Sequence, residues 1–158
     1  MVVQSFARAV PKDASAWLSK PVDQGRQALM SSARVKRLER KAQFAATLRH
    51  APVALTTHFA LHKMAATPPL FDAGQHAWAG VVVPKRWAKR AVTRTGIRRQ
   101  VFAAVEGIES HSVKPHAVVV RLRRGFDVAQ FPSAWSSALR DTVRAELVRL
   151  MSRAQLNL

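Results

Sequence analysis

The pattern of apolar and polar positions predicts both helices and strands along the chain. Residues 34–50 are rich in good helix formers and place most of their apolar side chains on one side, which predicts a basic amphipathic helix. In residues 57–62 apolar and polar positions alternate with a period of two, as in a half-buried strand. Residues 77–83 end in a run of valines and predict a second strand.

The second half of the chain continues the pattern with a helix, a strand and a final helix. Apolar side chains recur at every fourth position in residues 88–105, which predicts a helix, and residues 116–122 predict a third strand. A long apolar stripe predicts the last helix from about Ser133, and a further early strand is expected between Val53 and Gly74. The order α-β-β-(β)-α-β-α predicts a small α+β sandwich of helices on a sheet.

The length of 158 residues suits a single compact domain with additional terminal segments. Residues 1–33 show no period long enough to define an element, so they are expected to form an N-terminal extension. The folded domain is expected to span residues 34–152, and residues 153–158 are expected to form a C-terminal tail.

A strong positive charge adds a first indication of function. The chain contains 26 Lys and Arg against 9 Asp and Glu, which gives a formal net charge of +17 and a pI near 11.9. A surface this basic favours a polyanionic partner, because binding to phosphates releases condensed counterions. Apolar residues make up 48% of the sequence, so the chain is expected to fold rather than remain a basic tail.

Several function classes are disfavoured by what the sequence lacks. It contains no cysteine, which excludes disulfides, thiolate zinc sites and cysteine nucleophiles and fits a reducing cytoplasm. No apolar run is long enough to span a bilayer, so a cytoplasmic location without a membrane partner is expected. No hydrolase, zinc-protease, nucleotide-binding or paired-carboxylate motif occurs, so the polypeptide is expected to have no catalytic residues and no metal site of its own.

The segment between Asp72 and Glu106 is the clearest candidate for binding, because it contains many cations and no acidic residue. A helix would hold Arg90, Arg94 and Arg98 in one row that can follow a phosphate backbone. The alternative is a solvated basic face, but the segment offers no acidic residues with which such a face would form salt bridges.

Within this segment, GVVVPKRWAKRAVTRTGIRRQVF resembles the signature of the ribonuclease P protein family. In that family a strand leads through a Lys-rich turn into a helix that carries an Arg-Asn-Arg motif followed by a basic pair. Lys85 and Arg86 match the turn, and Arg94 matches the first Arg of the motif. Arg98 and Arg99 match the basic pair.

Two departures from this signature fall inside the predicted helix. Thr95 stands where the family usually has Asn, and Gly96 stands where it has a second Arg or another polar residue. Gly96 costs about 1 kcal/mol relative to Ala in a helix, and both changes remove side-chain contacts to RNA. The residues expected to bind the catalytic RNA are Lys85, Arg86, Lys89, Arg90, Arg94, Thr95, Arg98 and Arg99.

The resemblance extends over approximately residues 34–152. RLERKAQFAATL is similar to the family's first helix, THFALH to its first strand, and HAVVVRLRRG to the strand before its final helix. It implies a cleft between the first helix and the sheet that holds the single-stranded 5′ leader of precursor tRNA. The expected lining of this cleft is Phe44, Leu48, Phe59 and His62, whose aromatic rings could stack on nucleotides. By itself, a phenylalanine at helical spacing such as Phe44 is more often a core residue than a stacking one.

The resemblance also implies a mechanism and a left-handed βαβ crossover, which is an exception to the usual handedness. In the family a catalytic RNA removes the 5′ leader of precursor tRNA, using Mg²⁺ held mainly by that RNA. The protein would bind the ribonuclease P RNA and the leader, and would thereby favour precursor over mature tRNA and lower the Mg²⁺ needed. The expected partners are ribonuclease P RNA and precursor tRNA, and no DNA is expected.

Other functions remain open at this point. A ribosomal or RNA-assembly protein would share the charge, the size and the α+β pattern, and would bind RNA without leader dependence. The predicted strands on either side of residues 88–105 disfavour a helix-turn-helix DNA-binding regulator, and the scarcity of acids disfavours a protein-only nuclease. His58 and His62 would project from one face of a strand and could hold a metal, but no third ligand is evident.

Overall fold

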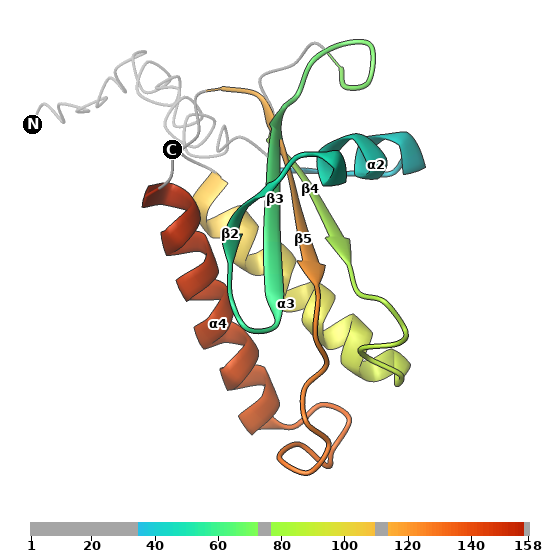
Figure 1. Cartoon of the computed structure of the whole chain (residues 1–158), viewed down its shortest axis with the longest axis vertical. Coiled ribbons are helices and arrows are strands. Elements are labelled where there is room, and N and C mark those ends of the chain that lie inside the picture. Colours follow the sequence, from blue (N-terminus) through green and yellow to red (C-terminus); the bar gives the residue numbers. More distant parts are fainter. Residues whose placement is uncertain (1–34, 73–76, 110–113, 157–158) are drawn as a thin grey trace, which may run out of the picture. The chain divides into compact units, whose positions relative to one another are not determined.

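The computed structural model describes residues 35–72, 77–109 and 114–156, which belong to one compact unit. The predicted extension, residues 1–33, lies outside the described residues. The elements follow one another along the chain as shown in Figure 1. They are β1 (Lys36–Arg37), α2 (Lys41–Arg49), β2 (Pro52–Leu55), β3 (Phe59–Ala65), β4 (Ala77–Val82), α3 (Ala91–Glu109), β5 (His116–Leu122) and α4 (Ser137–Leu156).

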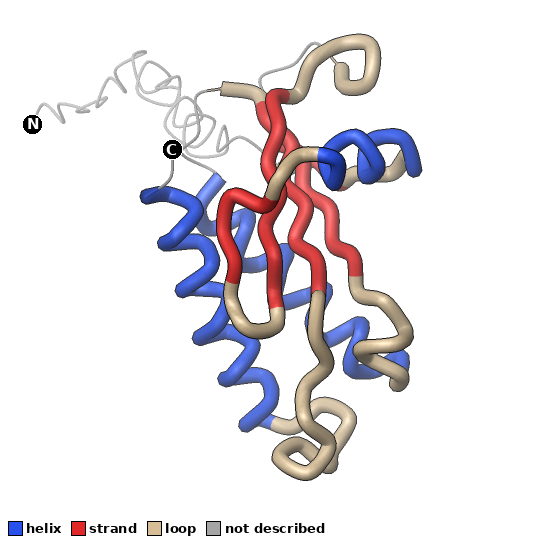
Figure 2. The backbone as a smooth tube through the Cα atoms, in the orientation of Figure 1, coloured by secondary structure: helices blue, strands red, loops and turns tan. Residues whose placement is uncertain are grey.

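The strands form one mixed, five-stranded sheet in the order β1-β4-β5-β3-β2. β4 pairs parallel with both β1 and β5, whereas β3 pairs antiparallel with both β5 and β2. The short helix α2 lies on one face of the sheet, and α3 and α4 cover the other face (Figures 1 and 2). The α+β sandwich predicted from the sequence is therefore confirmed, and β4–α3–β5 is its βαβ unit.

The main core fills the space between the sheet and the helices α3 and α4. From α3 it receives Ile97, Val101 and Val105, each at most 1% exposed, as their four-residue spacing predicts. From β5 it receives Val118 and Val120, while the alternate residues of this strand face α2. Burying each large aliphatic side chain contributes roughly 1.5–3 kcal/mol, so this layer fixes α3 firmly against the sheet. The contribution of α4 is Leu139, Val143, Leu147, Leu150 and Met151.

Three helices start later than the sequence pattern predicts, because hydrogen bonds outside the helices determine where they begin. Residues 36–37 pair with β4 instead of joining α2, and the carboxamide oxygen of Gln43 accepts the N–H groups of Glu39 and Arg40 at the helix start. Before α3, the N–H groups of residues 87 and 88 bond to the carbonyl of Pro84 and form a turn. The hydroxyl of Ser136 accepts the N–H of Leu139 and caps α4. At its other end, α4 continues past residue 152 to Leu156.

The strand predicted at residues 57–62 is shifted along the chain. Residues 56–58 form the turn of a hairpin, in which the N–H of Thr56 bonds to the carbonyl of Phe59. The further early strand expected between Val53 and Gly74 is β2, which begins at Pro52 and pairs with β3. β5 has the bounds that the sequence predicts.

Candidate nucleic-acid interface

The turn between β4 and α3 places the first cations of the predicted site on the surface. Val83 and Ala88 are buried at its two ends and fix the turn, while the side chains between them point outward. Lys85, Arg86 and Lys89 are all exposed. The β4–α3 turn therefore presents its charges to solvent.

Arg90 and Arg94 differ from their neighbours, because the protein itself uses part of their hydrogen-bonding capacity. Arg90 precedes the first residue of α3, and its Nη1 donates to the carbonyl oxygen of Pro132 at 3.2 Å. Nη1 of Arg94 donates to the carbonyl oxygens of Ala88 at 3.0 Å and Lys89 at 2.6 Å. The expected row of three equivalent arginines on one helix is thus only partly formed, since Arg90 lies outside the helix and Arg94 stabilises the turn.

Arg98 and Arg99 are exposed on α3, one turn beyond Arg94. Among the described residues, the carboxylates within 4.0 Å of a cation are those of Asp72, Asp141 and Glu146, and none of them pairs with a cation from residues 85–99. The positive charge of the turn and the helix is therefore not neutralised within this part of the chain.

The two departures from the family signature occupy different environments. Thr95 is exposed, whereas Gly96 is buried beneath the indole ring of Trp135. A Cβ atom added to Gly96 would collide with that ring, so any larger residue at this position would displace it. A surface cavity of about 450 Å³ lies here, bordered by Thr95, Arg99 and Arg140 as well as Trp135. Position 96 therefore packs against the segment before α4 and carries no RNA-binding side chain.

On the opposite face of the sheet, α2 brings Phe44 and Leu48 over the strands. Both side chains are half-buried and pack on the smaller apolar cluster of this face. Phe44 rests on Gly80 of β4: a Cβ there would lie 2.5 Å from its Cε1 atom and 2.7 Å from Cδ1 of Leu38. Glycine at position 80 thus lets an aromatic ring approach the sheet closely while one part of the ring stays exposed.

The structure separates the other two predicted residues of the leader cleft. Phe59 is 0% exposed and belongs to the core beneath α3 and α4, on the face away from Phe44, so it does not line the cleft. His62 is on the α2 face, in register with Val119 and hence in the same row as Gly80. It is buried, and its Nδ1 lies 2.8 Å from the carbonyl oxygen of His50, so the ring anchors the end of α2.

Arg121 was missed in the sequence, although a single cation inside the apolar run HAVVVRL is a detectable signal. It is half-buried in β5 and pairs with Val82 on one side and Ala60 on the other. By strand alternation it faces the same side as Val119, in the row next to the one that α2 covers. It therefore adds a positive charge to the face that carries Phe44.

The two histidines considered as a metal pair lie on different partners. His58 is in the hairpin turn, and its ring Nδ1 is 2.7 Å from Oε2 of Glu146 on α4, whereas His62 bonds near α2. The backbone N–H of His58 also donates to Oε1 of Glu146 at 2.6 Å. Burial raises the pKa of Glu146, but bonds from the His58 N–H, the Thr56 hydroxyl and the His58 ring outweigh it and lower the pKa below 4.5. These contacts tie the hairpin to α4.

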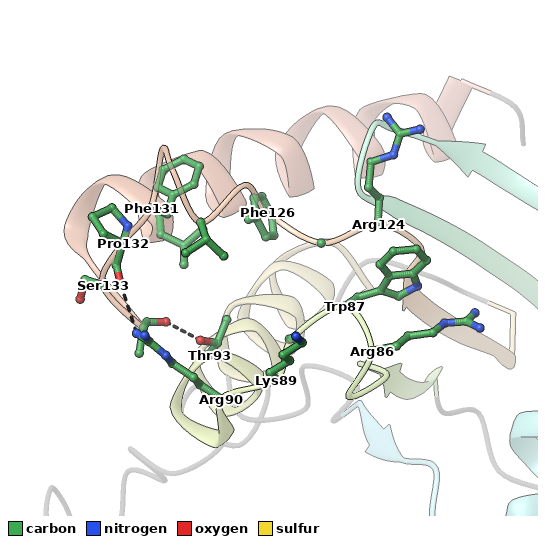
Figure 3. A pocket seen from close by; sticks show the side chains of 15 residues that line it. Arg86, Trp87, Lys89, Arg90, Thr93, Arg124, Phe126, Phe131, Pro132 and Ser133 are labelled. Carbon is green, nitrogen blue, oxygen red and sulfur yellow. Dashed lines mark hydrogen bonds between the residues drawn. The ribbon is translucent and has the colours of Figure 1, made fainter.

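A second missed feature is the loop between β5 and α4, which faces the β4–α3 turn across a cavity (Figure 3). Arg123 and Arg124 extend from the end of β5 and are exposed there. The sequence RRG shows their charge, but the nearness of Arg124 to Arg86 and Trp87 depends on the pairing of β4 with β5. The cations of the two connections therefore gather at one end of the sheet.

The structure is an α+β domain with un-neutralised cations on α3 and a sheet face that the short helix α2 covers. This combination is typical of a basic RNA-binding domain. The family model described as Ribonuclease P matches residues 33–154, and the chain therefore belongs to the ribonuclease P protein family. Curated relatives agree. The ribonuclease P protein component of Paraburkholderia xenovorans (strain LB400) is 30% identical over 118 residues, which cover 75% of this chain and 79% of that protein. That of Burkholderia mallei (strain SAVP1) is 28% identical over 128 residues, covering 81% and 88%.

Solved structures show the same fold. The RNase P protein of Staphylococcus aureus aligns with a TM-score of 0.56 at 16% identity, covering 79% of this chain and 100% of that one. The RNase P protein of Thermotoga maritima aligns with a TM-score of 0.52 at 18% identity, covering 75% and 96%.

Family membership settles the function at a coarse level. The chain is a protein subunit of an RNA-containing, metal-dependent endoribonuclease that matures the 5′ ends of tRNA, and its partner is the ribonuclease P RNA. The ribosomal and assembly-factor alternative is set aside by the family match. The helix-turn-helix alternative fails because the candidate recognition helix, α3, is packed on a five-stranded sheet.

Proposed function

We propose that the protein uses two separate surfaces, one for the ribonuclease P RNA and one for the 5′ leader of precursor tRNA. The first consists of the cations of the β4–α3 turn and α3, all exposed except the half-buried Arg94: Lys85, Arg86, Lys89, Arg90, Arg94, Arg98 and Arg99, with Thr95 beside them. The second is the sheet face next to α2. The two surfaces lie on opposite faces of the sheet, so both RNAs can be bound at once.

The observation that carries this proposal is the absence of carboxylate partners around the cations of residues 85–99 within the described part of the chain. A cation paired with a carboxylate would have to break that pair before it could bind a phosphate. Here the charges are available, and each phosphate contact contributes about 0.7–0.9 to the slope of log K against log salt concentration. The free guanidinium groups of Arg98 and Arg99 fit this role best.

The leader surface is proposed to consist of Phe44, Leu48 and Arg121. The half-exposed ring of Phe44 offers a stacking surface, and Arg121 in the neighbouring row offers a charge for a leader phosphate. His62 supports this surface by holding the end of α2, and does not contact the leader itself. α2 has only nine residues, so part of this sheet face is left uncovered beside it.

Mg²⁺ is proposed to be held by the RNA. In residues 35–72, 77–109 and 114–156 no three His, Cys, Asp or Glu side chains lie close enough together to hold a metal ion. In this proposal the protein binds and screens phosphates, and the RNA supplies the ligands of the metal. No helix within the described segments is long and apolar enough to cross a membrane. A cytoplasmic location, where tRNA precursors are processed, is part of the proposal.

Leader dependence tests the second surface. We expect the holoenzyme, assembled from ribonuclease P RNA and this protein, to bind precursor tRNA more tightly than mature tRNA. Phe44→Leu keeps an apolar side chain over Gly80 but removes the ring, and should raise the Kd for precursor about 5-fold or more while leaving the Kd for mature tRNA unchanged. Equal losses with both tRNAs would show that Phe44 only packs in the core.

A further inference from the structure

A surface cavity of about 460 Å³ separates the β4–α3 turn from the loop that joins β5 to α4 (Figure 3). This volume lies within the range of small-ligand pockets, roughly 300–1,000 Å³. Trp87 lines the side formed by the turn, and Arg124, Phe126 and Phe131 line the side formed by the loop (Figure 3). The cavity adjoins the proposed surface for the catalytic RNA, because Arg86, Lys89 and Arg90 border both.

Several contacts hold the two walls of this cavity in place. Gly125 packs directly on the turn: a Cβ at this position would lie 2.8 Å from the carbonyl oxygen of Trp87. At the other end, Arg90 donates to Pro132, and the hydroxyl of Thr93 donates to the carbonyl oxygen of Ala134 at 2.5 Å (Figure 3). The cavity is therefore built into the fold, so little ordering is needed when a ligand enters it.

The lining combines aromatic surface with positive charge. Trp87 is 37% exposed although it is a large apolar residue, and the guanidinium of Arg86 lies 5.2 Å from the centre of its ring. Val128 at the rim is 71% exposed. The lining contains the cations Arg86, Lys89, Arg90 and Arg124 and no Asp or Glu. An aromatic surface bordered by cations is the chemistry that binds an unstacked base together with its phosphates.

We propose that this cavity binds one unpaired nucleotide of the ribonuclease P RNA, with its base against Trp87 and its phosphates near Arg124 and Lys89. The inference rests on the proposed function and adds the β5–α4 loop to the same interface. The occupant is assigned to the catalytic RNA because the cavity is continuous with the cations of the β4–α3 turn. Phe126 and Phe131 in its wall pack against the core on the α3 and α4 face, away from Phe44 and the leader surface.

Assembly with the cognate ribonuclease P RNA, measured without tRNA, tests this site. Trp87→Leu should weaken RNA binding roughly 5- to 150-fold, the range expected for one lost base–aromatic stack, without changing the salt slope. Trp87→Phe should restore most of the affinity. Arg124→Gln should instead lower the salt slope by about one unit, whereas the matched change Arg149→Gln, at an exposed position on α4 outside the cavity, should not.

The outcomes separate the inference from the function on which it rests. If the wild-type protein fails to bind the RNA, the proposed function fails. If the wild-type protein binds and Trp87→Leu binds equally well, only the cavity assignment is overturned. A Trp87→Leu protein that assembles normally but loses affinity for precursor tRNA would place the nucleotide in the substrate and would also overturn it.

Cross-linking gives a readout that does not depend on variants remaining folded. Irradiation of the wild-type protein bound to ribonuclease P RNA containing 4-thiouridine should attach RNA to the peptides that carry Trp87 or Phe126. If every uridine of the RNA is replaced by 4-thiouridine and the cross-links are still confined to other peptides, the assignment is contradicted.

Discussion

Arg94 shows how one side chain serves both the fold and the interface. Its guanidinium bonds to two carbonyl oxygens of the β4–α3 turn, and its remaining N–H groups are still available to RNA. A change at Arg94 therefore alters stability and binding together. Arg98 and Arg99 have no hydrogen bond or ion pair assigned within the described segments and are exposed, so they are the better probes of binding alone.

Substitution of these two exposed arginines separates the contributions. Arg98→Gln combined with Arg99→Gln should lower the slope of log K against log salt for ribonuclease P RNA by roughly one to two units. The free energy of unfolding should change by less than about 0.5 kcal/mol, because both side chains are exposed. Arg94→Ala should instead reduce the free energy of unfolding by about 1–2 kcal/mol. Filter binding across a salt series and urea unfolding measure these effects, and an unchanged slope in the double variant would remove Arg98 and Arg99 from the interface.

Glu146 predicts how stability depends on pH. Its pKa is lowered in the folded protein, so its carboxylate contributes stability that is fully present above the ordinary carboxyl pKa of about 4.5. This contribution is lost as the pH falls through the lowered pKa of the folded state. Glu146→Gln should reduce the free energy of unfolding by about 1–3 kcal/mol at pH 7 and by less in the acid range. Urea unfolding of the wild-type protein and the variant, at pH 7 and in the acid range, measures the two reductions. Equal reductions under both conditions would show that the charge of Glu146 is not responsible.

At the scale of whole elements, apolar periodicity predicted the helices and strands well, and their ends poorly. The stripe of α3 and the apolar run of β5 are strong local patterns, and the structure confirms the helix and the strand that they predict. The start of α3 depends on a turn closed by the carbonyl of Pro84, and the start of α2 on the pairing of residues 36–37 with β4. Such contacts come from the tertiary fold, which a pattern along the chain does not contain.

For the candidate site, too, the sequence pattern could not predict contacts that depend on the tertiary fold. Alternation in THFALH separates Phe59 from His62 but does not say which face meets which helix. The family resemblance placed Phe59 in the cleft, whereas the structure places it in the core. The cations of the β4–α3 turn were visible because they follow one another in the sequence. The cavity beside them was not, because its walls are brought together only by the pairing of β4 with β5.

Two glycines of α3 provide a matched test of packing on this helix. Intrinsic helix propensity predicts that Gly→Ala stabilises a helix by about 1 kcal/mol. At Gly107 a Cβ would meet nothing within 4 Å, so Gly107→Ala should follow this expectation. At Gly96 the added methyl would displace Trp135, and overpacking of this kind costs about 1–3 kcal/mol, so Gly96→Ala should be neutral or destabilising. The urea midpoints of the two variants measure these changes in stability. Equal stabilisation of both variants would contradict the packing of Trp135 on α3.

For the molecule as a whole, charge and topology act together. The net charge of +17 attracts RNA of any sequence, and the fold places some of the cations where the proposed surfaces need them: on α3 with its adjoining turn, on the β5–α4 loop and on β5. In the function proposed for it, the protein acts on the reaction by holding two RNAs and screening their phosphates. Because Mg²⁺ ions also screen phosphates, the contribution of the protein should be largest when Mg²⁺ is scarce.

The most direct test is therefore cleavage of a precursor tRNA by a bacterial ribonuclease P RNA at low Mg²⁺ concentration, with and without this protein. We predict strong stimulation by the protein, product with the correct 5′ end, and no cleavage by the protein alone. Binding to the RNA without any stimulation of cleavage, or cleavage by the protein in the absence of the RNA, would contradict its role as the subunit that assists a catalytic RNA.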